Sequence, residues 1–211
     1  KEMASAFGKA AKAAGISQIV YLGGIANDEK KSRHLQSRTD TGKELAKYGV
    51  PVLELRAGII IGSGSASFEM LRHLTHRLPI MTTPKWVKNR TQPIAIRDVL
   101  YYLTNCAAMD NSVSGIYDIG GPEVLTYEAM MQKFAKISGL RRRIIVKVPV
   151  LTPSLSSLWI GFVTPVPTTL ARPLVESLIS EVVVDKNKSI SKLIPDPTTG
   201  LLDVNQAINL S

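Results

Sequence analysis

A histidine and an arginine stand four residues apart in the stretch HLQSRTDTGK, residues 34–43. In an α-helix this spacing places His34 and Arg38 on one face, one turn apart. Histidine titrates near neutral pH and can donate or accept a proton, whereas arginine stays charged and offers several N–H donors to ribose or phosphate oxygens. The fixed charge of Arg38 would lower the pKa of His34. The residue types therefore indicate a candidate proton-transfer or anion-binding site.

Three interpretations of this pair stay open on the sequence alone. His34 could transfer a proton, Arg38 could bind ribose or phosphate without ordinary carbonyl reduction, or both could lie on an ordinary solvated helix face. Ser32 and Ser37 would supply hydroxyl groups nearby, although a serine on a polar helix is usually only solvated. The elements around the pair decide what it can reach.

The first half of the chain alternates helix and strand patterns. Apolar residues at helical spacing predict a helix over 2–14, and the apolar run QIVYLGG (18–24) predicts a buried strand. A polar loop (26–33) and a helix (34–48) follow, and the β-branched run PVLELRAGIIIG (51–62) predicts the next strand. Such alternation is typical of right-handed crossover units and a parallel sheet.

The second half is less regular. Its predicted elements are a helix over 65–77, an extended piece and a helix within 90–109, a strand at 115–121, a helix at 125–139 capped by Thr126, a basic strand at 141–148 and a regular pattern at 174–184. The tail, 185–211, is polar and turn-rich, and we expect its end to fray.

Composition indicates a globular chain: 45% of the 211 residues are hydrophobic and 20% are charged. The single cysteine, Cys106, cannot form an internal disulfide, so we expect a reducing compartment and a cytoplasmic location. The net charge of +9 would suit nucleic acid, but the basic residues are scattered, and Arg141–Arg143 is the only tight cluster. We therefore expect a small anionic ligand in preference to nucleic acid.

The stretch from Val148 to Ala171 carries no charge, which raises the question of a membrane segment. Four prolines interrupt it, so a spanning helix would have to re-satisfy many backbone groups. We interpret it as an irregular apolar segment that packs on the domain or lines a pocket, and we keep contact with a membrane surface as the alternative.

The order of several motifs resembles the short-chain dehydrogenase/reductase superfamily, in particular its atypical and extended NmrA-like and NAD-dependent epimerase/dehydratase-like branches. The motifs are VYLGG (20–24), His34-x-x-x-Arg38, LRAG (55–58), QPIAIRDV (92–99) and YDIGGPEVLTYEAMM (117–131). The resemblance implies an α/β fold: part of a Rossmann-like doubly wound parallel sheet followed by a mixed α+β substrate region. It assigns 1–125 to the C-terminal half of an NAD(P)-binding domain and 126–211 to a substrate or lid region.

The resemblance also implies roles for individual residues. His34 and Arg38 stand where the superfamily carries its catalytic Tyr-x-x-x-Lys pair, and Gly23 and Gly24 stand where a catalytic Ser or Thr is expected. The implied cofactor is NAD or NADP. Its implied contacts are Gly23, Gly24, Arg38, Ala57, Gly58 and Ile59, and the implied contacts of the small-molecule substrate are Ser63, Ser65, Phe68 and Gln92.

One departure from the superfamily pattern is large. The Gly-x-x-Gly-x-x-Gly turn that holds the cofactor pyrophosphate is absent, and GSGSAS (62–67) follows a later strand with the wrong spacing. We therefore expect the chain to be the C-terminal portion of a longer protein, whose N-terminal half is its natural partner. A strand edge left uncovered would then favour self-association.

No metal site is expected, because Glu69, His73 and His76 share one predicted helix without a further convergent ligand. The first functional hypothesis is an NAD(P)-binding oxidoreductase of the epimerase-like or NmrA-like kind. The second is a non-catalytic relative that senses NAD(P) or regulates a partner, and the third is a scaffold whose cofactor site has decayed. Loss of the tyrosine favours the second, whereas the titratable His34 keeps the first open.

Overall fold

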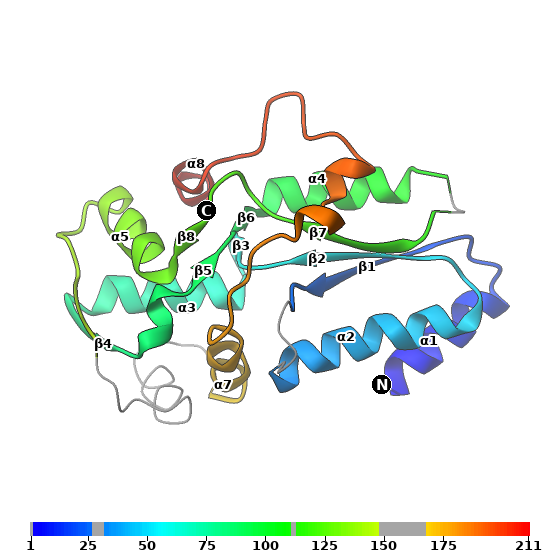
Figure 1. The fold of residues 1–211 in the computed structure, drawn as a ribbon, viewed down its shortest axis with the longest axis horizontal. Helices are drawn as coiled ribbons and strands as arrows, with labels where there is room; N and C mark the ends of the chain where they lie inside the picture. Colours follow the sequence, from blue (N-terminus) through cyan, green and yellow to red (C-terminus); the bar gives the residue numbers. More distant parts are fainter. Residues whose placement is uncertain (1, 27–31, 111–112, 148–167) are drawn as a thin grey trace.

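The computed structural model describes residues 2–26, 32–110, 113–147 and 168–211. Its main sheet has the strands β1 (Ile19–Gly24), β2 (Val52–Ala57) and β7 (Gly115–Ile119), all parallel and in the order β1-β2-β7. Helices α1 (Glu2–Ala13) and α2 (Arg33–Leu45) lie on one face of this sheet, and α4 (Ile96–Ala107) lies on the other (Figure 1). The predicted α/β fold with helices on both faces of a parallel sheet is confirmed.

The central strand explains the order of the sheet. Leu53 and Leu55 of β2 are fully buried in a cluster with Val99 and Tyr102 of α4. Such a strand needs a neighbour on each side, and β1 and β7 provide them. Among the described residues β1 pairs only with β2, so its other edge is free of strands.

A second region carries shorter strand pairs and a separate apolar core. Two of these pairs are parallel: β3 (Ile60–Ile61) with β6 (Ile94–Ala95), and β4 (Ile80–Thr83) with β9 (Ile144–Lys147). The third pair, β5 (Arg90–Thr91) with β8 (Leu125–Thr126), is antiparallel. The helices α3 (Ala66–Arg77), α5 (Tyr127–Ile137) and α8 (Val204–Asn209) surround this core. Short 3₁₀ turns complete the chain: η1 (Ala46–Tyr48), η2 (Lys85–Lys88), η3 (Lys186–Lys188) and η4 (Ile190–Lys192).

The strand predicted over 51–62 is in fact two strands. The chain leaves the main sheet after Ala57, and Ile60–Ile61 pairs with Ile94–Ala95 instead of continuing along β1. A Cβ on Gly58 would lie 3.0 Å from Val182 Cγ1, so this glycine lets Val182 pack closely against the bend. This break opens space at the carboxyl end of the main sheet.

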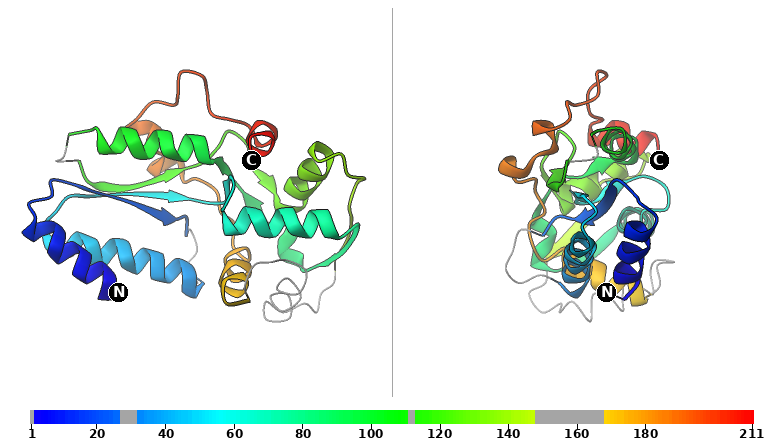
Figure 2. Two further views of the ribbon diagram at one scale, coloured as in Figure 1. Left: turned by 180° about the vertical axis from the view of Figure 1, so that it is seen from behind. Right: turned by 90° about the vertical axis from the view of Figure 1, so that its right-hand side faces the viewer.

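The C-terminal tail does not fray as expected. Asp203 caps α8 with a complete capping box, in which Asp203 Oδ1 accepts from Gln206 N at 2.8 Å. Val204, Ala207 and Ile208 are buried against the second core. The polar composition of the tail hid these three apolar residues at helical spacing. Figure 2 shows the helix that they form, in red, at the C-terminal end of the chain.

Helix α7 (Thr168–Ser177) lies at the start of the regular pattern expected at 174–184. Most of the apolar segment 148–171, interpreted above as a packing or pocket-lining element, lies outside the described residues. Within the described ranges, every helix is too short or too polar to cross a membrane.

Candidate functional site

A cavity of about 510 Å³ lies at the carboxyl ends of β1 and β2. Its wall combines the end of β1 (22–25), three residues of α2, the segment 57–67 that leads from β2 into α3, and the segment 173–182 that includes the end of α7. In open parallel sheets, ligands bind outside the carboxyl ends of the strands. The cavity therefore occupies the position that this architecture reserves for a ligand.

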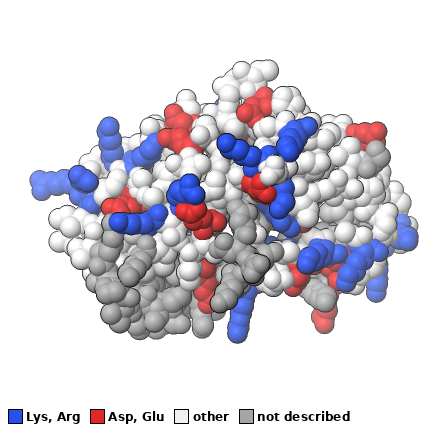
Figure 3. All heavy atoms as spheres, in the orientation of Figure 1, with Lys and Arg blue, Asp and Glu red and all other residues white. Residues whose placement is uncertain are grey.

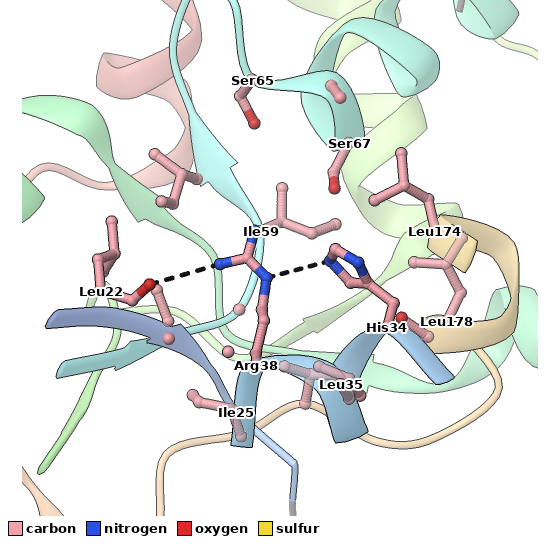
Figure 4. Close-up of a pocket in the computed structure, with 18 of the residues that line it drawn as sticks. Leu22, Ile25, His34, Leu35, Arg38, Ile59, Ser65, Ser67, Leu174 and Leu178 are labelled. Carbon is pink, nitrogen blue, oxygen red and sulfur yellow. Dashed lines mark hydrogen bonds between the residues drawn. The ribbon is translucent and has the colours of Figure 1, made fainter. Parts of the chain in front are cut away.

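His34 and Arg38 both line this cavity and contact one another. Arg38 Nε donates to His34 Nε2 at 3.1 Å, and Arg38 Nη1 donates to the carbonyl of Leu22 at 3.5 Å (Figure 4). Burial and the adjacent Arg38 charge lower the pKa of His34. We therefore assign a neutral imidazole that accepts through Nε2 and carries its proton on Nδ1. In this state His34 orients Arg38 and does not serve as a cationic acid.

Gly23 and Gly24 also line the cavity, and the structure gives each a packing reason. A Cβ on Gly23 would lie 2.9 Å from Glu54 Oε1, and a Cβ on Gly24 would lie 3.0 Å from Leu35 Cδ2. Gly24 thus lets α2 approach β1 closely, whereas Gly23 leaves room for the Glu54 side chain of β2. This close approach brings the Arg38 guanidinium over the strand ends.

Ala57, Gly58 and Ile59 form the part of the wall where β2 ends. Two of their carbonyls are already engaged, because Ala57 O accepts from Ile25 N at 3.0 Å and Ile59 O accepts from Ile94 N at 2.9 Å. The bonds fix the backbone at the bend and leave an apolar surface from Ala57 and Ile59. Such a wall can pack against a flat ring.

The residues expected on the substrate side separate into two groups. Ser63 and Ser65 line the cavity, and Ser65 lies across it from the Arg38 guanidinium (Figure 4). Phe68 is instead 1% exposed in the second core, and it is absent from the cavity wall. The Gln92 amide binds backbone on both sides, donating to Gly121 O at 2.8 Å and accepting from Val184 N at 3.1 Å. The structure therefore brings two of these four residues to the cavity.

Two serines join α2 to α7 at the rim of the cavity. Ser32 caps α2, with Oγ accepting from Leu35 N at 3.2 Å, and the same oxygen lies 2.9 Å from Ser177 Oγ of α7. Ser177 Oγ also donates to Pro173 O at 2.8 Å. Ser32 thus acts as a helix cap and a link, whereas Ser37, the other serine considered as a substitute hydroxyl, is exposed.

Sequence reasoning missed several cavity residues. Leu174 and Leu178 of the α7 segment form an apolar wall (Figure 4). Tyr127, in the first turn of α5, also lines the cavity. The spacing of Leu174 and Leu178 by four is a helical signal, but it follows a proline-rich stretch without regular pattern. Tyr127 gave no signal beyond its place after the Thr126 cap.

Charge on the molecular surface is mixed. Lys and Arg alternate with Asp and Glu over the described part of the face in Figure 3. Some pair directly, such as Lys133 with Glu123 and Arg90 with Glu181. On this face the positive net charge does not gather into one continuous basic surface.

No family model matches the chain, and no curated protein matches its sequence. Solved structures do match. An NADPH-dependent quinone oxidoreductase from Escherichia coli shares 20% identity at a TM-score of 0.71, over 99% of this chain and 72% of its own. A nucleoside-diphosphate-sugar epimerase from Staphylococcus aureus shares 14% identity at 0.70, over 97% and 69%. Triphenylmethane reductase from Citrobacter sp. shares 18% at 0.66, over 98% and 68%.

These similarities confirm the fold that the motifs of the sequence implied. The chain has the Rossmann-like α/β architecture of these reductases and epimerases, and it aligns with them over almost all of its length. The first of them spans a further 28% of its own length beyond the part that this chain covers.

Proposed function

We propose that this chain binds NAD(P) and belongs to an oxidoreductase that acts on a small, largely apolar molecule, with the cavity holding the nicotinamide end of the cofactor. The observation that carries this proposal is the oriented Arg38 guanidinium over the carboxyl ends of two parallel strands. Neighbours at this fold level include the E. coli quinone oxidoreductase complexed with NADPH and a Bordetella bronchiseptica enzyme in complex with NAD and UDP.

The residues present fit the nicotinamide ribose. Arg38 uses Nε and one Nη1 proton for His34 and Leu22, which leaves further N–H donors toward the cavity for ribose hydroxyls. Ala57, Gly58 and Ile59 offer a flat wall for the ring, and a volume of about 510 Å³ is in the range of small-molecule sites. When bound, the cofactor would supply hydride exchange with the substrate.

The chain's own contribution is binding and orientation. His34 holds the Arg38 side chain, while Leu174 and Leu178 of the α7 segment shield the cavity from water. The only unprotonated nitrogen of neutral His34 is Nε2, which accepts from Arg38, so the imidazole can take up a proton only when this contact opens. In the structure its role is therefore the orientation of Arg38.

The free edge of β1 supports a further part of the proposal. Among the described residues β1 has a strand on one side only, so further strands could pair with its other edge and carry the glycine-rich pyrophosphate site that this sequence lacks. We assign that role to an N-terminal segment of the same protein. A cytoplasmic location fits this proposal, because the buried Cys106 thiol takes part in no disulfide.

Calorimetric titration with NADPH and with NADH tests the proposal, followed by turnover assays with quinone and dye acceptors in which loss of the reduced cofactor is recorded. Saturable binding with turnover supports an oxidoreductase. Saturable binding without turnover of any acceptor would favour the non-catalytic, NAD(P)-sensing alternative. If the protein binds neither NADPH nor NADH, both the oxidoreductase proposal and the NAD(P)-sensing alternative are contradicted.

A further inference from the structure

Two buried hydroxyl groups lie behind the apolar wall of the cavity. Tyr127, the first residue of α5, is 2% exposed and lines the cavity, and Thr91 of β5 is fully buried. The pairing of Thr91 with Leu125 places β5 beside the start of α5. The Thr91 hydroxyl faces the Tyr127 phenol closely enough to influence its ionisation. However, Thr91 Oγ1 completes no hydrogen bond of normal geometry with any described residue.

This incomplete pairing is unusual for buried polar atoms. Nearly all buried hydroxyls in folded proteins have a hydrogen-bond partner, and an orphaned one costs free energy. Trp86 stands edge-on to the Tyr127 ring, with centroids 6.1 Å apart and planes at 88°, and fixes the ring in place. Thr91 Oγ1 therefore has hydrogen-bonding capacity to spare beside a tyrosine whose ring Trp86 contacts.

The pair is close to the space that a ligand would fill. A Cβ built on Gly58, a cavity residue, would lie 3.7 Å from Thr91 Oγ1 and 3.0 Å from Val182 Cγ1. The other side chains on this part of the wall include Ile59 and Leu178, which cannot hydrogen-bond. A polar pair behind an apolar surface recognises a mostly apolar molecule that carries an isolated oxygen.

We propose that the Tyr127 hydroxyl binds the carbonyl oxygen of an apolar ketone or quinone in this cavity, and that Thr91, which lies behind the cavity wall, positions the phenol. Burial raises the pKa of Tyr127 to about 12, so the phenol stays protonated at neutral pH and donates to the oxygen. Thr91 can donate to the phenol oxygen, because the single phenol proton is then given to the ligand. This inference rests on the proposed function in placing the substrate in this cavity. Binding of the ketone or quinone requires no cofactor.

Two probes that differ only in a carbonyl group measure the contribution of the carbonyl oxygen to binding. 1-Tetralone and tetralin have the same ring system, and the ketone oxygen of the first replaces two hydrogens of the second. Ligand-observed NMR titration of the protein gives both dissociation constants for wild type, Tyr127→Phe and Thr91→Val. Tyr117→Phe serves as the matched control, because Tyr117 lies on β7 outside the cavity wall.

We expect wild type and Tyr117→Phe to bind 1-tetralone about fivefold to tenfold more tightly than tetralin, which is the effect of one hydrogen bond. Tyr127→Phe should abolish the preference and leave tetralin binding unchanged, and Thr91→Val should reduce it. The melting temperature of each variant controls for folding. Lack of a preference in wild type, or its persistence in both variants, would overturn the assignment. Failure of the proposed function would instead appear as absent NAD(P) binding with the tetralone preference intact.

Discussion

The guanidinium of Arg38 is held by a neighbour on its own helix, with Nε donating to His34 Nε2 at 3.1 Å. The same imidazole nitrogen cannot accept this bond and carry a proton. Protonation of His34 would therefore break the contact and place two cations one helical turn apart. The orientation of the candidate ribose-binding group depends on His34 staying neutral.

Acidification should therefore destabilise the protein through His34. Burial and Arg38 lower the pKa of His34 in the folded state, whereas an unfolded histidine titrates near about 6.5. The unfolded state then binds more protons below that pH, so this contribution to stability is lost as pH falls from about 6.5 through the folded pKa. Urea unfolding of wild type and His34→Gln across this range measures the effect. Wild type should lose more stability on acidification, and equal losses in both proteins would contradict the assigned neutral state.

Arg38 and His34 should differ in their effects on cofactor affinity. Arg38→Met removes the charged donor to ribose and should weaken NADPH binding by at least about tenfold, the effect of losing a hydrogen bond to a charged group. His34→Gln retains an acceptor for Arg38 Nε and should bind NADPH nearly as well as wild type, whereas His34→Leu should bind less tightly. Calorimetry compares the three variants. Equal affinities of His34→Gln and His34→Leu would show that orientation of Arg38 does not matter.

The fit of α2 against the sheet depends on Gly42. A Cβ at this position would lie 2.2 Å from Oε2 of Glu54, whose buried carboxylate pairs with Arg56 at 2.7 Å. Gly42→Ala should therefore destabilise the fold by about 1–3 kcal/mol despite the higher helix propensity of alanine. Ser37→Ala, on the exposed face of the same helix, is the control and should change stability by no more than about 0.5 kcal/mol. Chemical denaturation measures both, and an unchanged midpoint for Gly42→Ala would contradict the packing described.

The link between Ser32 and Ser177 should contribute measurably to stability. Ser177→Ala removes this hydrogen bond and the one from Ser177 Oγ to Pro173 O, and should cost about 1–2 kcal/mol. Ser32→Ala removes the shared bond and the helix cap on Leu35 N, so its cost should be similar, about 1–2 kcal/mol. The double variant should be less destabilised than the sum of the two single changes, because they share one interaction. Strict additivity would indicate that the two hydroxyls do not interact in solution.

Periodic patterns in the sequence were sufficient to predict the strands of the main sheet and the helices beside it. The apolar run at 51–57 is the buried central strand, and the run at 18–24 pairs with it as a half-buried strand. Thr126 caps α5 as its position indicated, with Oγ1 accepting from Ala129 N at 3.1 Å. The motif spacing also brought His34 and Arg38 to the same cavity as Gly23, Gly24 and the 57–59 turn. These residues meet because a strand followed by a helix places the end of the strand beside the start of the helix.

Other features depend on contacts that are distant in sequence. The strand break after Ala57 results from pairing with Ile94–Ala95, and the C-terminal helix forms because Val204 and Ile208 find a core built by α3 and α5. Asp98, in the first turn of α4, is buried and accepts from Leu202 N at 2.8 Å, which ties down the tail. The division of the chain at residue 125 remains a prediction.

The central claim is that the cavity over the ends of β1 and β2 holds the nicotinamide ribose. Reduced nicotinamide mononucleotide tests it most directly, because this probe lacks the adenosine part that binds elsewhere. Amide ¹H–¹⁵N shifts of the protein are recorded during its titration. The account expects saturable shifts concentrated at Gly23, Gly24, Ala57, Gly58 and Ile59, with loss of these shifts in Arg38→Met. Shifts concentrated away from these residues, or no saturable shifts, would contradict it.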